Sequence, residues 1–313
     1  MTIGKKETHG GMRMPLQLEE KKNSNNNRKY MLEKLSSRLF QFCALLSVIS
    51  LLLIVGFVFY KGSLPFVVDG YSFFDFLFGV DWVPSEEKFG ILPMIVASIY
   101  ATIGALVIGV PIGLFTAIFL AEIAPKRVAK FISPAVQLLA GIPSVLYGVF
   151  GLALIVPFLQ NQLNLVKGQS LIAVILVLAI MMLPTIVTVA ETAIRAVPKT
   201  YREGSLALGA SEIETIFKVV VPAAKSGIMA AIVLGLGRAI GETMAVILVA
   251  GNSLILPTSL TDSVRPLTTN IALEMGYAFG THQEMLFATG IVLFSFILIL
   301  NFVLAKISAK GGQ

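Results

Sequence analysis

Six long apolar runs constrain the fold of this chain more than any other feature of its sequence. They lie at about 39–60, 91–121, 132–159, 171–196, 224–250 and 285–306. The first run has 22 residues, and a helix of that length, rising about 1.5 Å per residue, can cross the roughly 30 Å hydrocarbon core of a bilayer. Only 13% of the residues are charged, about half the share in a typical soluble domain. The sequence therefore predicts an all-α membrane protein, a polytopic bundle of six transmembrane helices.

Prolines fall inside three of the predicted spans, among them Pro111, Pro143 and Pro184. Because proline removes a backbone donor and clashes with the preceding turn, we expect a kink near Pro111. Pro143, in the segment AGIPSVLYG, either opens the helix bundle with a kink or only improves its packing. The sequence leaves both interpretations open.

The distribution of lysine and arginine predicts which loops face the cytoplasm. With these spans, 19 of the 24 basic residues lie on the side of both termini, and four lie on the other side. Cytoplasmic loops of membrane proteins are enriched in lysine and arginine, so we expect both termini in the cytoplasm. The even number of spans agrees with this orientation.

The same pattern predicts how the chain is divided. Residues 1–38 form a basic cytoplasmic tail, which we expect to be largely disordered, with a short helix at 30–38. The remaining parts are a first transmembrane helix, an external loop, a transmembrane domain with a cytoplasmic loop at 197–222, and a cytoplasmic C-terminus, at 39–60, 61–90, 91–306 and 307–313.

Several kinds of function are excluded by what the sequence lacks. The single cysteine, Cys43, cannot make a disulfide framework or a cysteine-based metal site within one chain. The phosphate-binding motif G-x-x-x-x-G-K-[ST] is absent, since Ala224 stands where Lys225-Ser226 would need a glycine. The basic residues lie in short segments between apolar runs, which argues against nucleic-acid binding. We expect no catalytic residues, no cofactor and no metal, and any ATP-driven step must be carried out by a partner.

Two external loops are too long to be simple connections. Residues 61–90 contain Trp82, several phenylalanines and five acids. Residues 251–284 include LTTNIALEMGYAFG, which we expect to form a short amphipathic helix. Both loops either contribute to a surface for an external partner or only cover the ends of the helices.

The cytoplasmic loop at 197–222 has the pattern of two short helices. Gly209 marks a turn between them, and Ser211 with Glu214 has the spacing of a capping box that opens the second helix. Pro222 ends that helix before the fifth span. The loop also carries apolar side chains that need a surface to bury against: Leu206, Leu208, Ile213, Ile216, Phe217 and Val219.

Arg238 and Glu242 place two charges inside the fifth span, in LGLGRAIGETMAV. A charge at the bilayer centre costs about 2.5–3.5 kcal/mol, and we expect these two residues, four apart on one helix face, to pair. Gly235, Gly237 and Gly241 narrow the helix, so that another helix or a substrate can approach closely. The pair either fixes helix register against a partner subunit or lines a substrate path, where the arginine fork suits a tetrahedral oxyanion such as phosphate or sulphate.

A second pair with the same spacing, Glu191 and Arg195, lies near the cytoplasmic end of the fourth span. Arginine at the end of a span commonly extends to the membrane–water interface. We therefore expect this pair to anchor the helix end rather than to line a path.

The cytoplasmic loop resembles the EAA loop of binding-protein-dependent ABC importer permeases. Glu203, Gly209 and Pro222 occupy the three anchor positions of that motif, with small or aliphatic residues at the others: Gly204, Ser205, Val219 and Val221. In that family the loop forms a coupling helix that docks in a groove of the ATPase subunit, so the resemblance implies that these residues couple the chain to an ATPase.

Three segments resemble PstC-type permease subunits of phosphate ABC importers. They are FLAEIAP at 119–125, LAGIPSVLYGVFGL at 139–152 and LGLGRAIGETMAV at 234–246, and the resemblance extends over about residues 90–306. It implies the type I ABC importer permease fold. It also implies a substrate path that includes Arg238, Glu242, Gly237, Gly241 and Thr243.

The resemblance further implies a set of partners and a location. The chain is expected to pair with a second permease subunit, to bind two copies of an ATPase and to receive phosphate from an external phosphate-binding protein, in the inner membrane of a bacterium. Two alternatives stay open. One is a permease for another oxyanion (sulphate, molybdate or phosphonate), and the other is an ATP-independent secondary transporter, which needs no ATPase-docking loop.

Overall fold

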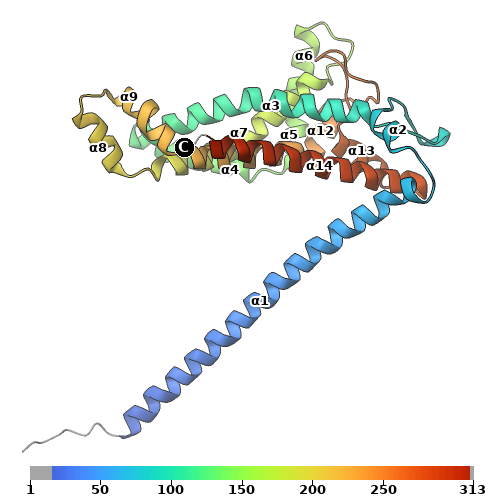
Figure 1. Cartoon of the computed structure of the whole chain (residues 1–313). Helices are drawn as coiled ribbons and strands as arrows, with labels where there is room; N and C mark the ends of the chain where they lie inside the picture. The colour runs from blue at the N-terminus through green and yellow to red at the C-terminus, as the bar shows by residue number, and fades with distance from the viewer. Residues whose placement is uncertain (1–15, 311–313) are drawn as a thin grey trace, which may run out of the picture. The chain divides into compact units, whose positions relative to one another are not determined.

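The computed structural model describes the backbone of residues 16–310 and the side chains of residues 30–306 (Figure 1). It is almost entirely helical, with one two-stranded antiparallel hairpin in which Trp82 pairs with Phe89. The helices and strands are α1 (Leu16–Val67), α2 (Phe73–Phe78), β1 (Trp82–Val83), β2 (Lys88–Phe89), α3 (Leu92–Ile118), α4 (Lys126–Ala140), α5 (Ser144–Phe150), α6 (Val156–Gln162), α7 (Leu171–Arg195), α8 (Lys199–Ala207), α9 (Glu212–Thr215), α10 (Val221–Ala223), α11 (Lys225–Ile240), α12 (Met244–Val249), α13 (Leu267–Glu274) and α14 (Thr281–Lys310).

The chain divides into two compact units after Phe57. In the first unit, α1 is helical from Leu16 onward. The prediction of disorder is therefore wrong for residues 16–29, while the helix predicted at 30–38 is confirmed as part of α1. A helix nucleated in the apolar span extends into adjoining polar residues at little cost, because each added residue brings its own hydrogen bond. The part of that prediction that concerns residues 1–15 lies outside the described residues.

Five helical segments within the described residues are long and apolar enough to cross a membrane. They run over Tyr30–Val67, Leu92–Ile123, Ser144–Gln162, Leu171–Arg195 and Thr281–Lys306. A sixth is made by Glu212–Ala223 and Lys225–Ile240, two helices that meet at an angle of 69°. The polytopic all-α fold is thus confirmed, with a sharp bend in one of its spans.

The third predicted span, 132–159, is not one helix. α4 ends at Ala140 with Gly141 as its C-cap, and α5 begins after Pro143. Proline has no N–H to continue the ladder and disfavours helical geometry at the residue before it. Neither interpretation of Pro143 as a kink therefore holds, since the chain breaks there into an amphipathic helix and a separate span. By contrast, α3 and α7 each continue as one helix through Pro111 and Pro184.

The core of the second unit lies where α3 and α11 pack against α7. Fifteen residues of α7 are buried, and the contacts are close because glycines face its large side chains. A Cβ added at Gly109 of α3 would lie 2.7 Å from Met182 Sδ, and one added at Gly235 of α11 would lie 2.7 Å from Ile186 Cγ1. Small residues that let helices approach in this way are typical of membrane helix packing. The arrangement holds α3, α7 and α11 as one closely packed group.

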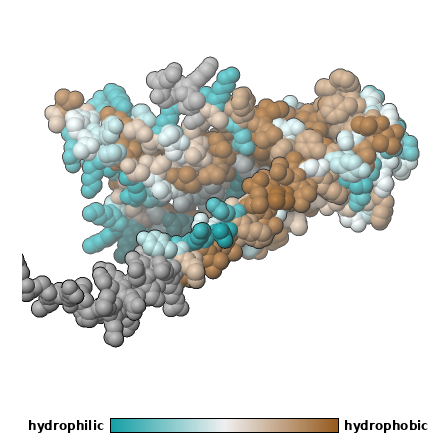
Figure 2. Space-filling view, turned by 60° about the horizontal axis from the view of Figure 1, so that its bottom comes forward, coloured by the Kyte–Doolittle hydropathy of each residue, from teal (hydrophilic) through white to brown (hydrophobic). Residues whose placement is uncertain are grey.

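Residues 61–90 are more ordered than a loop. α1 continues to Val67, so the first span is longer at both ends than the predicted 39–60. Beyond it, α2 and the β-hairpin bury Phe76, Trp82 and Phe89 against α13 and α14 in a core of their own. We call residues 68–91 together with residues 251–280 the outer cap. In Figure 2, hydrophilic side chains gather at the end of the second unit where α8 and α9 lie, and hydrophobic ones predominate toward its other end.

Candidate functional site

Arg238 lies in the last turn of α11, where the fifth predicted span is interrupted. α11 ends at Ile240, Gly241 follows as its C-cap, and a new helix, α12, begins at Met244. Three glycines in seven residues lower the helix propensity here, since each costs about 1 kcal/mol relative to alanine in a helix interior. The prediction of one continuous helix over 224–250 is therefore wrong.

The predicted Arg238–Glu242 pair is also not formed. In the part of the chain that the structure describes, no ion pair joins these two side chains. Arg238 Nη1 instead donates to Thr185 Oγ1 of α7 at 3.3 Å. The positive charge of Arg238 also interacts with the hydroxyl group of Tyr147 in α5. The i, i+4 geometry on which the prediction depended is lost because the helix ends between the two residues.

Glu242 has a different structural role. Its Oε1 accepts a hydrogen bond at 2.9 Å from the backbone N–H of Ala245, and the residue is only 8% exposed. The first N–H groups of a helix have no partner within it, and a carboxylate at that position satisfies one of them. The Glu242 carbonyl accepts from Thr268 Oγ1 of α13 at 3.2 Å. Glu242 thus starts α12 and joins the broken span to the outer cap.

The other predicted path residues lie beside Arg238 on an open face. Gly237 and Gly241 are exposed, and no described atom from another element lies within 4 Å of the place that a Cβ at Gly237 would take. Thr243 donates to the carbonyl of Gly241 at 3.3 Å. The structure therefore brings Gly237, Arg238 and Gly241 together on one surface and places the Glu242 carboxylate in the interior.

The loop at 197–222, which we predicted to be cytoplasmic, forms the two expected helices, although the second runs through Pro222 to Ala223. α8 is followed by Gly209, whose φ of +87° is a conformation that glycine adopts without strain. Ser211 and Glu214 form the reciprocal capping box at the start of α9. Pro222 lies in α10, two residues before the bend at Ala224. Ser205 of α8 bonds Thr215 of α9 through their hydroxyls at 2.9 Å, which holds the two helices together.

The loop exposes much of its apolar surface. Ile216 is buried within the chain, but Leu208 is 91% exposed, Ile213 63% and Phe217 46%. Contiguous exposed apolar side chains on a polar loop mark an interaction surface. Of the remaining predicted coupling residues, Glu203, Gly204 and Pro222 are exposed, and Ser205, Val219 and Val221 are half-buried.

Two arginines hold the residues at the end of α3. The sequence predicted an ion pair for one of them, Arg195, but not for the other, Arg202. Arg195 of α7 pairs with Glu191 at 2.9 Å, as predicted, and also donates to the carbonyl of Leu120 at 2.6 Å. Arg202 of α8 forms an ion pair with Glu122, which lies in the π-helical turn Phe119–Ile123 that follows α3. The only signal for that contact in the sequence was a lone glutamate at the end of a span.

A buried carboxylate organises the outer cap. Glu274 of α13 accepts hydrogen bonds from Trp82 Nε1 at 2.8 Å and from Arg265 Nη1 at 2.7 Å, and its Oε2 lies 2.8 Å from His282 Nε2. Glu274 is 5% exposed. Burial of a charge is tolerated only with such partners. The network joins the β-hairpin, the loop before α13 and the start of α14, and it confirms that LTTNIALE forms a helix.

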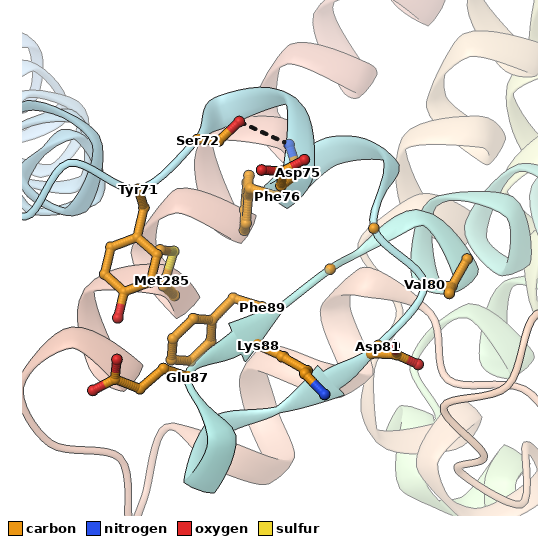
Figure 3. A pocket seen from close by; sticks show the side chains of 12 residues that line it. Tyr71, Ser72, Asp75, Phe76, Val80, Asp81, Glu87, Lys88, Phe89 and Met285 are labelled. Atoms are coloured by element: carbon orange, nitrogen blue, oxygen red, sulfur yellow. Dashed lines mark hydrogen bonds between the residues drawn. The ribbon is translucent and has the colours of Figure 1, made fainter.

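A hollow of about 300 Å³ opens in the outer cap beside the β-hairpin (Figure 3). Burial raises the pKa of the Tyr71 hydroxyl, and the charge of Glu87 beside it raises that pKa further. The lining combines apolar side chains with three carboxylates and one lysine: Phe76, Phe89, Met285, Asp75, Asp81, Glu87 and Lys88. This excess of negative charge makes the hollow a poor site for an anion.

Comparison with known proteins agrees with these features. Residues 109–310 match the family described as binding-protein-dependent transport system inner membrane component. A probable ABC transporter permease protein of Bacillus subtilis (strain 168), YqgH, is 42% identical over 272 residues, 84% of this chain and 88% of that protein. The phosphate transport system permease protein PstC of Pasteurella multocida (strain Pm70) is 35% identical over 263 residues, 77% of this chain and 82% of that protein.

The helices also superpose on a solved permease. The structure of a bacterial alginate ABC transporter in complex with an alginate pentasaccharide-bound periplasmic protein matches with a TM-score of 0.61 and 17% identity, over 93% of this chain and 98% of that one. At this identity the likeness concerns the fold alone. The sequence match and the fold together place the chain among the binding-protein-dependent transport system inner membrane components, as a multi-pass permease with the type I ABC importer fold.

Proposed function

We propose that this chain is the permease subunit of an ATP-driven importer for inorganic phosphate. The observation that carries the proposal is the position of Arg238. Its guanidinium is half-buried within a broken span, bonds a hydroxyl rather than a carboxylate, and lies on an open glycine face. Because the charge is not neutralised by Glu242, its donors remain available to an oxyanion that passes along this face.

The similarity to phosphate permeases supports phosphate as the cargo. Several relatives named as PstC share about a third of their residues with this chain over most of its length. Phosphate, sulphate and molybdate are all tetrahedral oxyanions that an arginine fork can bind. Phosphate alone of these carries a proton near neutral pH, so selectivity between them has to come from a protein that recognises that proton before delivery. We assign this step to the external binding protein.

The cytoplasmic loop supports coupling to a separate ATPase. Leu208, Ile213 and Phe217 are exposed on a loop whose two helices are tied together, which is the form of a rigid docking surface. We propose that this surface, with Glu203 and Gly209, fits a groove of the ATPase. Two ATPase copies and a second permease would complete the importer, with the loop and both termini in the cytoplasm.

Phosphate uptake by the complete importer tests the function. Arg238→Gln, which keeps the length of the side chain but not its charge, is expected to abolish phosphate uptake while the subunits still co-purify. Arg127→Gln, at an exposed arginine in the first turn of α4, serves as a matched control for loss of an arginine. Wild-type uptake by Arg238→Gln would contradict the proposed path. Equal uptake of sulphate and phosphate with the cognate binding protein would contradict the assignment of the cargo.

A separate variant tests the docking surface. Gly209 has a positive φ, so Gly209→Asp adds both strain and charge at the turn between α8 and α9. We expect it to weaken co-purification of the ATPase or to leave hydrolysis without transport. Gly276→Asp is the control, because Gly276 lies in an outer turn without close neighbours among the described residues. An unchanged ATPase complex together with wild-type transport per ATP hydrolysed in Gly209→Asp would exclude the loop as the docking site.

A further inference from the structure

The end of α3 is an irregular turn whose backbone is completed by a side chain from another helix. Residues Phe119–Ile123 form a π-helical turn, in which Ala124 N–H bonds the carbonyl of Phe119. In this register the carbonyl of Leu120 would need the N–H of residue 125, which is a proline and has none. Arg195 of α7 supplies the missing donor at 2.6 Å. The turn is therefore attached to the end of α7.

The same turn is attached to α8 by a largely buried ion pair. The side chain of Glu122 is 7% exposed, and that of Arg202, its partner, is 28% exposed. Nε of Arg202 is buried and has no described hydrogen-bond partner. A buried ion pair of this kind is costly to break, because the remaining charge is left without compensation. α8 and the end of α3 are thus held together more firmly than a surface ion pair would hold them.

These contacts connect the cytoplasmic loop to the site of Arg238 through packed helices. Only Ala196, Val197 and Pro198 separate α7 from α8. α3 packs on α7 through glycines, and α7 carries Thr185, the hydrogen-bond partner of Arg238. On its other side the loop leads into α11 through the 69° bend at Ala224. A bend can absorb motion of the loop, whereas the two arginine contacts oppose movement of α8 relative to α3.

We propose that the Arg202–Glu122 ion pair is the contact through which the cytoplasmic loop moves α3 and α7 together when the ATPase changes state. Arg202 and Glu122 are positioning residues in this scheme, since neither touches the cargo or ATP. The inference rests on the proposed function, because it requires that the loop docks an ATPase. It goes further, because it assigns the transmission of motion from the ATPase to α8 and the π-helical turn rather than to the bend before α11.

A charge-reversal cycle in the reconstituted importer tests the pair. The measurements are phosphate uptake, ATP hydrolysis and co-purification of the ATPase, all in proteoliposomes with the external binding protein. Arg202→Glu and Glu122→Arg alone are each expected to lower the phosphate imported per ATP hydrolysed by about tenfold, since each replaces the buried ion pair with two like charges that repel. The ATPase should still co-purify. The double variant, with the charges exchanged, is expected to recover most of the lost coupling, which a purely structural defect would not do.

Two further variants keep the test decisive. Glu122→Gln removes the charge without introducing repulsion and should uncouple in the same way even if a reversal prevents assembly. Lys88→Glu, which breaks an exposed ion pair with Glu86 in the outer cap, is the matched control. It should leave the ratio of phosphate imported to ATP hydrolysed unchanged. A wild-type ratio in the single variants, or a double variant as uncoupled as the singles, would overturn the inference. Absence of any ATPase from the unmodified complex would instead overturn the proposed function.

Discussion

Arg238 of α11 donates to the hydroxyl of Thr185 on α7 at 3.3 Å, and not to Glu242 four residues along its own chain. This contact fixes the position of the only basic residue inside the predicted spans away from their ends. It also leaves most of the guanidinium donors unused by the described part of the chain. The arginine is therefore positioned by a neutral partner that does not cancel its charge, as an anion path requires.

The first prediction concerns Thr185. Thr185→Val keeps the shape of the side chain and removes the acceptor, so Arg238 should lose its fixed orientation. A hydrogen bond to a charged group contributes about 1.5–3 kcal/mol, so phosphate uptake is expected to fall by about tenfold or more. Thr185→Ser should retain uptake. Thr116→Val is the control, because the Thr116 hydroxyl bonds only the carbonyl of Ile112 in its own helix. Equal uptake by Thr185→Val and wild type would show that the contact is dispensable.

The approximate positions of the first, second, fourth and sixth membrane spans were predictable, because length and apolarity alone decide them. The capping box of Ser211 and Glu214 was predictable too, since both partners lie within four residues. The breaks after Ala140 and Ile240 were not, because glycine and proline also occur within continuous membrane helices. Pro111 and Pro184, like Pro143, lie within apolar runs but leave their helices unbroken.

The contacts around the site were least predictable. Glu122 and Arg202 are 80 residues apart, and Trp82 and Glu274 are 192 apart. Such pairs depend on how helices are arranged in space, which no local spacing encodes. The expected Arg238–Glu242 pair failed for a related reason: its spacing was right for a helix, but the helix ends between the two residues. Assignments based on spacing are therefore least secure where glycines are most frequent.

The second prediction concerns the approach of α5 to α12. A Cβ at Gly148 would lie 2.7 Å from the Cα of Ala245, a backbone atom that cannot rotate away. Gly148→Ala should therefore force the helices apart and lower stability by about 1–3 kcal/mol, the usual cost of overpacking. Thermal unfolding of the purified chain in detergent measures the change. Gly56→Ala, where the described structure leaves open space, should not lower the unfolding temperature. Equal unfolding temperatures for the two variants would contradict the close contact.

The third prediction concerns the buried carboxylate of the outer cap. Glu274→Gln leaves Arg265 without its counter-charge in the interior, and loss of one partner of a buried pair costs about 3–5 kcal/mol. Because Trp82 is the only tryptophan and bonds Glu274, its fluorescence reports directly on the cap. We expect earlier thermal unfolding and red-shifted emission. Glu86→Gln, in an exposed pair with Lys88, should change neither property. Unshifted emission from Glu274→Gln would show that the carboxylate is not required to hold the hairpin.

The last prediction concerns pH and the turn at residues 258–262. The backbone N–H groups of Thr258 and Ser259 each donate to Asp262 Oδ2 at 2.8 Å. These hydrogen bonds lower the pKa of the Asp262 carboxyl below its ordinary value near 3.8. A lowered pKa in the folded state means that the carboxylate stabilises the turn at all pH values above the ordinary pKa. That contribution is lost only as the pH falls through the lowered value. Carbon-13 NMR of the labelled protein should find Asp262 still mostly ionised at pH 3.8, the ordinary pKa of an aspartate. Removal of the Thr258 hydroxyl by Thr258→Val should raise the pKa of Asp262 slightly, because both backbone donors remain. Half protonation of Asp262 at pH 3.8 would mean that the turn does not hold the carboxylate.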